Sequence, residues 1–147
     1  MVEFNPIPEI SLGRRTTSEV TQTDKARRVV IRRQLSATIS AERFVRAQTD
    51  GKMMLCSQND SKSCRPIGLT LQSGNEGDYI EILVHGVAII TTDLGSLADD
   101  AVVFLLDDGQ FGAFDSTLNY AVVVGQLVDS GNGLLVQIST HPITLNN

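Results

Sequence analysis

The sequence has few of the residues on which catalytic and membrane proteins rely. It contains 147 residues, with no tryptophan, two cysteines and two histidines. No apolar run approaches the roughly 18 residues of a membrane-spanning helix, so we expect no contact with a membrane. The opening MVEFNPIPEI lacks a basic stretch followed by an apolar one, and we expect no secretory signal. Without such a signal, Cys56 and Cys64 are more typical of free thiols than of a disulfide.

No group of residues has the spacing of a catalytic or metal site. His85 and His141 do not accompany a nucleophile elbow or any other catalytic motif. The acid pairs at 99–100 and 107–108 lack the spaced oxygen ligands of a calcium loop. The glycine-containing SGNEGDY joins two predicted strands and opens no helix, so it does not suit a phosphate loop. We therefore expect no enzymatic activity, no cofactor, no metal and no small-molecule substrate.

Basic residues are absent from the second part of the chain. All twelve lysines and arginines lie at or before Arg65, together with seven acids, which gives this part a net charge of +5. The residues after Arg65 contain ten acids and no base, for a net charge of −10. Such a strongly acidic segment would repel a polyanion such as nucleic acid.

What the chain does have is short apolar runs of strand length. In DYIEILVHGVAII, Ile80, Ile82 and Val84 alternate with Glu81, Leu83 and His85, which is the period of two of a strand. No segment after residue 45 shows a sustained apolar stripe at helical spacing. The sequence predicts an all-β fold with strands near residues 43–48, 52–57, 78–90, 101–106, 119–128 and 133–140.

The turn residues occur twice at nearly the same spacing. The first series is Asp50-Gly51, Gly68 and Gly74-Asn75, and the second is Asp108-Gly109, Gly125 and Gly131-Asn132. Asp, Asn and Gly suit tight turns, and glycine within a strand marks a bulge or a close backbone contact. Coincidental spacing of turn glycines in an all-β chain is the alternative. We favour internal duplication, which predicts a small β-barrel of two pseudo-repeated halves.

The chain divides by composition near residue 43. Residues 1–42 are interpreted as an extended basic N-terminal arm, and residues 43–147 as the β-barrel domain. The arm's arginine cluster suggests phosphate binding, which makes a nucleic-acid-binding β-barrel module the alternative function. No aromatic residue lies between positions 14 and 43 for base stacking, however, so we favour strand addition to a sheet, the protein's own or a partner's. The candidate partner-binding residues are Phe4, Ile7, Ile10, Arg14, Arg15, Arg27, Arg28, Val29, Ile31, Arg32 and Arg33.

The region from about Arg43 to Thr140 resembles the small head decoration (capsid cement) proteins of tailed bacteriophages. The matching features are a glycine-bearing strand, a Gly-Asp turn before a valine-rich strand, a DDG turn and a final glycine-bearing strand pair. In this sequence they fall at Gly68, Gly77-Asp78, Gly86, Gly95, Asp107-Asp108-Gly109 and Gly125. The long basic arm departs from the smallest members of that family and leaves the mode of attachment open.

The resemblance implies a barrel or β-tulip domain that forms a homotrimer. It further implies a structural protein of the virion, made in the host cytoplasm and bound to the capsid exterior at local threefold positions. Its partners would be the major capsid protein and other copies of itself, with no nucleic acid involved. Its function would be to hold neighbouring capsomers together against the pressure of packaged DNA.

Overall fold

The computed structural model describes residues 27–95 and 97–146. Over these residues the regular structure is β, with two single-turn 3₁₀ segments at Asp107–Gly109 and Asp129–Gly131 and no α-helix. This confirms the predicted all-β class. None of the described helical segments is long and apolar enough to cross a membrane.

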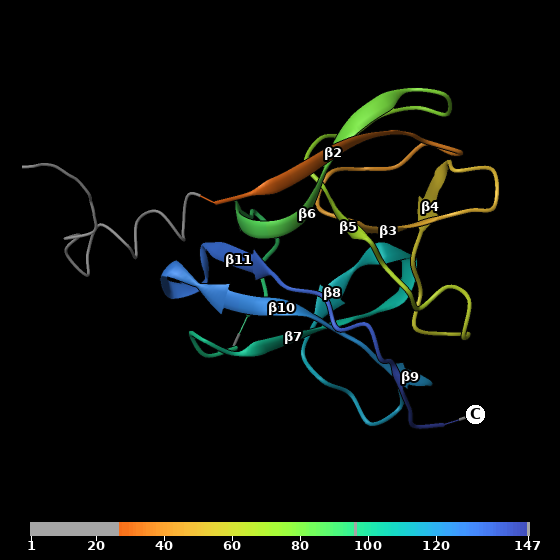
Figure 1. The fold of residues 1–147 in the computed structure, drawn as a ribbon. Coiled ribbons are helices and arrows are strands. Elements are labelled where there is room, and N and C mark those ends of the chain that lie inside the picture. The colour runs from red at the N-terminus through yellow and green to blue at the C-terminus, as the bar shows by residue number, and fades with distance from the viewer. Residues whose placement is uncertain (1–26, 96, 147) are drawn as a thin grey trace, which may run out of the picture.

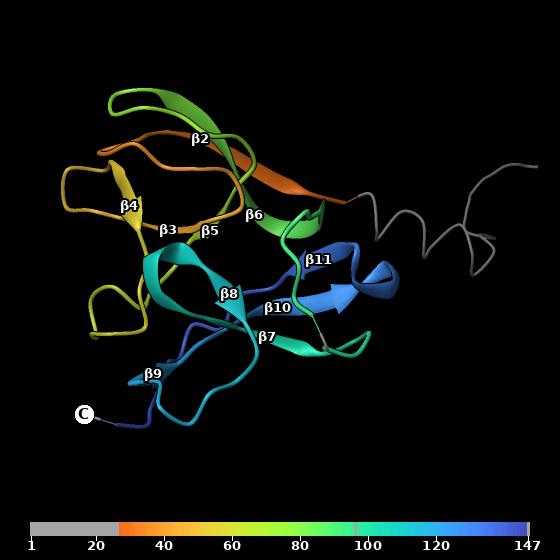
Figure 2. The same ribbon diagram turned by 180° about the vertical axis from the view of Figure 1, so that it is seen from behind.

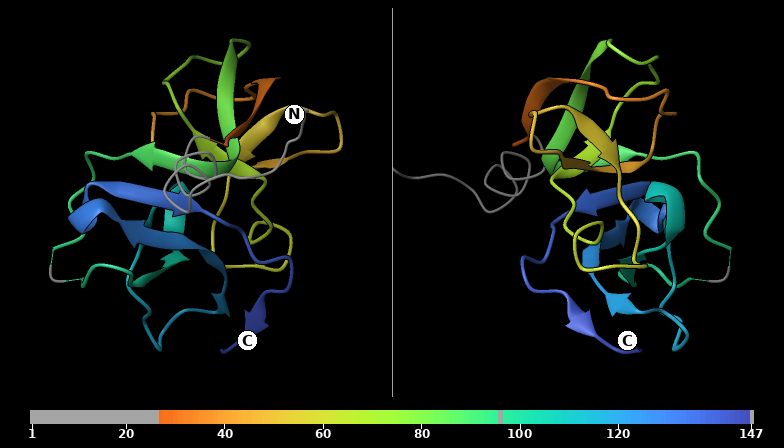
Figure 3. Two further views of the ribbon diagram at one scale, coloured as in Figure 1. Left: turned by 60° about the vertical axis from the view of Figure 1, so that its left-hand side comes forward. Right: turned by 90° about the vertical axis from the view of Figure 1, so that its right-hand side faces the viewer.

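One curled sheet contains most of the strands (Figures 1 and 2). Its order is β4–β3–β5–β6–β11–β10–β7–β8, with β2 paired to β6, and β9 and β12 form a separate pair. The bounds are β2 Val29–Gln34, β3 Phe44–Ala47, β4 Met53–Leu55, β5 Gly68–Thr70, β6 Tyr79–Ile89, β7 Val102–Leu105, β8 Phe111–Gly112, β9 Tyr120–Ala121, β10 Val123–Val128, β11 Gly133–Val136 and β12 Ile143–Thr144. Figure 3 shows the curl as two facing groups of strands, β2 to β6 on one side and β7 to β11 on the other.

The strand order supports the predicted duplication. From the centre outwards, one side of the sheet reads β6, β5, β3, β4 and the other reads β11, β10, β7, β8. In chain order, β3, β4, β5 and β6 therefore correspond to β7, β8, β10 and β11. The registers agree as well: Val45 pairs with Gly68, and Val103 with Gly125 at the equivalent place.

The same correspondence extends to single backbone hydrogen bonds. Glu42 and Asp100 lie two residues before β3 and β7, respectively, and share an unusual positive φ, 59° and 67°. The amide of Glu42 donates to the Thr70 carbonyl at 2.9 Å, and the amide of Asp100 donates to the Leu127 carbonyl at 3.0 Å. Non-glycine residues rarely adopt positive φ. Its occurrence at both equivalent sites shows that the halves share local geometry as well as topology.

β2 completes the repeat. It pairs with the first part of β6, and residues 86–89 of the same strand pair with β11 in the equivalent manner. The long strand β6 therefore ends the first half and begins the second. One predicted landmark does not match: residues 71–78 link β5 to β6, whereas the shorter 129–132 links β10 to β11. Gly74 forms a bridge with Ile39 and Gly131 has a φ of +86°, so the two Gly-Asn sequences are not structurally equivalent.

Two apolar clusters form the core. The smaller lies within the first half and consists of Leu35, Ile39, Val45, Met53, Ile80 and Ile82. The larger joins the halves and includes Phe44, Leu69 and Leu83 from the first half with Val103, Leu105, Phe111 and Leu134 from the second. Across this junction the rings of Phe44 and Phe111 meet edge to face, with centroids 5.6 Å apart. Burial of both halves' apolar residues in one cluster makes the duplicated sheet a single folding unit.

Both cysteines are buried free thiols, as expected. They belong to the larger cluster. Burial raises the pKa of the Cys56 thiol far above its ordinary value, and burial also raises that of Cys64. The reactive thiolate form is therefore disfavoured at both positions.

The folded unit begins before the predicted boundary at residue 43. Leu35 and Ile39 are 0% and 2% exposed, and β2 pairs along β6 through six residues. A boundary at residue 43 thus cuts through the first half of the repeat. Residues 1–26 lie outside the described part of the chain, so the predicted arm is tested only at its C-terminal end.

Glu42 ties the two halves together through its side chain. Its carboxylate accepts hydrogen bonds from the backbone amides and hydroxyls of Thr91 and Thr92, at 2.6 to 3.2 Å. Burial raises the pKa of Glu42, but the hydrogen bonds from Thr92 and Thr91 outweigh it and leave the pKa below 4.5.

Replacing Glu42 by glutamine is expected to lower the free energy of unfolding by about 1–2 kcal/mol near neutral pH, because charge-assisted hydrogen bonds become neutral ones. The folded-state pKa is depressed, so the wild-type advantage is complete above 4.5 and is lost as the pH falls through that folded-state value. Urea unfolding of both proteins over an acidic pH series measures this difference. A difference that stays constant with pH would contradict the assigned role.

Candidate partner-binding strand

β2 presents apolar and basic side chains together at the surface. Val29 and Val30 are 50% and 40% exposed, and Arg32 and Arg33 are also exposed. Ile31 is half-buried and packs against the smaller core cluster. The register shifts between Val29 and Val30, because Val29 pairs with His85 and Val30 with Leu83, so the extra residue of this β-bulge lies in β6.

One backbone edge of β2 has no neighbouring strand among the described residues. β2 pairs with β6, and beyond its end Leu35 forms a single bridge with Met53, where the Ser36 amide donates to the Met53 carbonyl at 2.9 Å. Before that closure, residues 29–33 have one side paired and one side open. We call the open side of residues 29–33 the β2 edge. An open edge of this kind is a template for strand addition by another chain.

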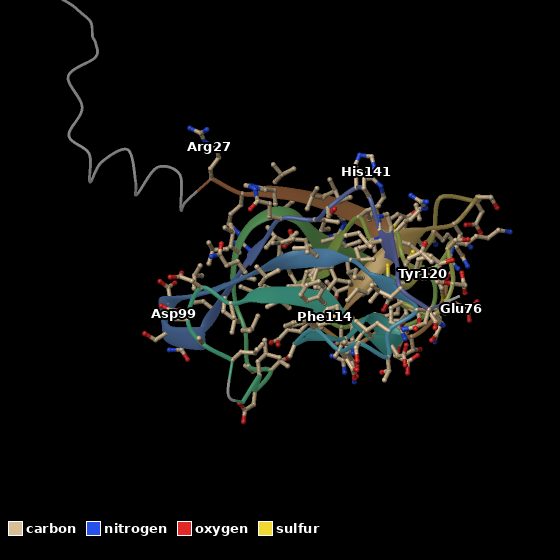
Figure 4. The ribbon with its side chains drawn as sticks, turned by 90° about the horizontal axis from the view of Figure 1, so that it is seen from below. Arg27, Glu76, Asp99, Phe114, Tyr120 and His141 are labelled. Atoms are coloured by element: carbon tan, nitrogen blue, oxygen red, sulfur yellow. The ribbon has the colours of Figure 1, made fainter. Side chains whose placement is uncertain are left out.

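Gly86 fixes where the chain enters the fold. Its φ is +126°, and a Cβ there would lie 3.1 Å from the Arg28 Cα and 3.1 Å from the Arg27 carbonyl oxygen. Glycine therefore allows the start of β2 to lie directly against β6. Figure 4 labels Arg27, the first described residue, at this margin of the molecule.

The structure brings together part of the predicted site. Arg27, Arg28, Val29, Ile31, Arg32 and Arg33 lie on or next to β2, while Phe4, Ile7, Ile10, Arg14 and Arg15 lie outside the described residues. Strand addition to the protein's own sheet, one of the two options left open, is observed. Val30 was missed as a surface residue. The period of two places Val30 on the same side of the strand as Arg28 and Arg32, which are exposed as well, so alternation was the signal that could have identified it.

The residues considered for chemistry lie separately at the surface. His85 and His141 are both exposed, and so are the acid pairs at 99–100 and 107–108. Within residues 27–95 and 97–146, no three His, Cys, Asp or Glu side chains are grouped so as to hold a metal ion. The β2 edge is consequently the candidate site that the geometry supports best.

Comparison with known proteins adds little to this description. No protein-family model matches the chain, and no curated protein matches it. Among solved structures, the crystal structure of the head fiber gp8.5 N base in bacteriophage phi29 aligns with a TM-score of 0.44 at 14% sequence identity. The alignment covers 78% of this chain and 98% of that chain. A likeness this loose identifies neither the family nor the function of this protein.

Proposed function

We propose that this protein is a structural protein of a bacteriophage virion. It binds the outer surface of the capsid as a trimer and holds neighbouring capsomers together against the pressure of packaged DNA. Its partners are the major capsid protein and other copies of itself. The observation that carries the proposal is the open β2 edge, where Val29, Val30, Arg32 and Arg33 are exposed. The sequence resemblance of residues 43–140 to phage decoration proteins supports the same function.

In this proposal the barrel provides the trimer and the N-terminal segment provides the anchor. Exposed ion pairs contribute only about 0–1 kcal/mol each, so the arginines alone give little affinity. Strand addition provides backbone hydrogen bonds, and apolar burial adds about 25 cal/mol per Å² of area removed from water. Three linked anchors then act at high effective concentration, which multiplies individually weak contacts.

Substituting serine for both Val29 and Val30 is expected to weaken capsid binding by at least about tenfold, because the lost apolar burial exceeds about 1.4 kcal/mol. The matched double variant Arg32→Gln with Arg33→Gln is expected to lose less than about fivefold in capsid affinity at physiological salt, where exposed charges are screened. Co-sedimentation with capsids of the phage that encodes the protein measures both. The opposite ranking would show that charge, not strand addition, dominates the contact.

Salt titration separates this function from nucleic-acid binding. A site with six phosphate contacts loses about a thousandfold in affinity between roughly 50 and 200 mM salt, whereas an apolar interface changes far less. If the protein binds bare DNA with that steep dependence and fails to bind capsids, the arginine cluster of β2 is a phosphate site and the structural proposal is wrong.

A further inference from the structure

Four adjacent strand segments in the second half contain no charged residue. They are residues 86–89 of β6 together with β11, β10 and β7, and they lie side by side in the sheet. An antiparallel sheet with one face in water normally alternates apolar and polar residues. These segments are apolar on both faces, which is typical of strands that are covered on both sides.

The chain itself covers one of those faces. Ala88, Leu134, Leu127 and Val103 point inwards and are buried in the larger core cluster. Their neighbours along each strand point to the opposite side. A continuous row crosses that side, since Val87 pairs with Leu135, Leu135 with Gln126 and Gln126 with Val102. We call this side the outer face, defined by Val87, Ile89, Val102, Gln126, Val128 and Leu135.

The outer face is partly open to solvent. Ile89 is 87% exposed and Val102 is 46% exposed, and the other members of the face are half-buried. The face continues along β7 to Phe104, whose ring meets that of Phe114 with centroids 5.3 Å apart. Phe114 is itself 52% exposed. A contiguous apolar patch of this kind on a soluble domain marks an interaction site.

Opposite charges lie at two borders of the outer face. At the β6 border, Arg28 lies against Gly86 at the start of β2. At the other border, Asp99 accepts a hydrogen bond from the Ser130 amide at 3.1 Å, and the Asp100 carbonyl accepts one from the Gln126 side chain at 3.1 Å. Figure 4 shows Arg27 and Asp99 at separate places on the surface. A surface with an uncharged centre, one basic border and one acidic border is complementary to a second copy of itself.

We propose that the outer face is the surface through which copies of this chain associate. Each copy carries a net charge of −5, so copies repel unless the contact itself excludes charge, as this face does. Around a threefold axis, the basic border of one copy meets the acidic border of the next, and the apolar centres are buried together. The inference deepens the proposed function and rests on it only for the number of copies.

Replacing Ile89 by glutamate tests the inference. Ile89 is 87% exposed in the protomer, so the substitution leaves the fold intact, and circular dichroism checks this. The wild type is expected to sediment as an oligomer. Ile89→Glu is expected to raise its dissociation constant at least about 30-fold, because a charge replaces a large apolar side chain within the contact. Val102→Glu is expected to act in the same direction.

The matched control is Ile143→Glu, because Ile143 is 63% exposed but lies on β12, away from the face. The mass of the Ile143→Glu variant should equal that of the wild type. Light scattering over a range of protomer concentrations gives the masses.

Three results would overturn the inference. One is a wild type that stays a single protomer at every concentration. Another is an unchanged mass for both Ile89→Glu and Val102→Glu. The third is faster hydrogen exchange in residues 1–26 of Ile89→Glu with no change of mass, which would show that the N-terminal segment covers the face. Failure of the proposed function would look different. If the wild type is an oligomer that the substitution Ile89→Glu dissociates, but the wild type does not bind capsids, the proposed function is wrong and this inference stands.

Discussion

Removal of residues 1–26 is expected to weaken capsid binding at least about a hundredfold and to leave the barrel folded and oligomeric. Three linked anchors would be lost at once, and avidity from linked sites reaches 10² to 10⁴. The folded unit should survive because β2, both core clusters and the outer face all lie in the residues that remain. Co-sedimentation with capsids measures the binding, and light scattering measures the mass.

The length of the deletion matters. A deletion to residue 40 would also remove β2 and the buried Leu35 and Ile39, and the loss of this core is expected to unfold the first half. Such a variant serves as a control for nonspecific loss of binding. Full capsid occupancy by the shorter deletion, which lacks only residues 1–26, would show that the anchor lies elsewhere.

Alanine at Gly68 or at Gly125 is expected to destabilise the protein by about 2–3 kcal/mol, and by similar amounts at the two sites. At Gly68 a Cβ would lie 2.6 Å from the Leu83 carbonyl oxygen, and at Gly125 it would overlap the Leu135 carbonyl oxygen. Backbone atoms of a paired strand cannot move aside as a flexible side chain does, so the sheet itself must distort. Because the glycines occupy equivalent places in the two halves, their costs test the duplication directly.

Gly51→Ala is the matched control. Gly51 has a φ of +85° but no atom within 4 Å of the added Cβ, so only the conformational cost of about 1 kcal/mol is expected. Urea unfolding at one fixed protomer concentration compares the three variants, since self-association makes stability depend on concentration. Equal and small costs at all three positions would mean that the two strand glycines are not close-contact positions.

The strands and the repeat could be predicted from sequence because their signals are local. The hairpin around Asp50-Gly51 and the strand glycines Gly68 and Gly125 combine turn residues with short apolar runs, and all three fall where expected. The Gly-Asn pairs were misleading, since the same two residues occur in links of different length.

The boundary of the folded unit could not be predicted in the same way. β2 belongs to the barrel because it pairs with β6, about fifty residues further along the chain, and no local pattern encodes that pairing. The same holds for the β-bulge between these two strands, because it exists only through the register of β2 with β6. Composition alone, with its arginines and prolines, marked the whole segment as an arm.

The outer face could not be predicted from the sequence for a related reason. The apolar runs near residues 101–106 and 119–128 were predicted as strands, and one side of each is buried. A strand that is apolar on both faces is consistent with burial inside one chain or between several copies of it. In the structure Ile89 and Val102 are exposed on one side, which supports the proposed association of copies.

The most direct test of the proposed function is electron cryomicroscopy of capsids incubated with the purified protein. The account predicts added density on the outer capsid surface at local threefold positions, with three barrels in each feature and the N-terminal segments leading to neighbouring capsomers. Capsids that remain bare under saturating protein, or density confined to the capsid interior, would contradict it.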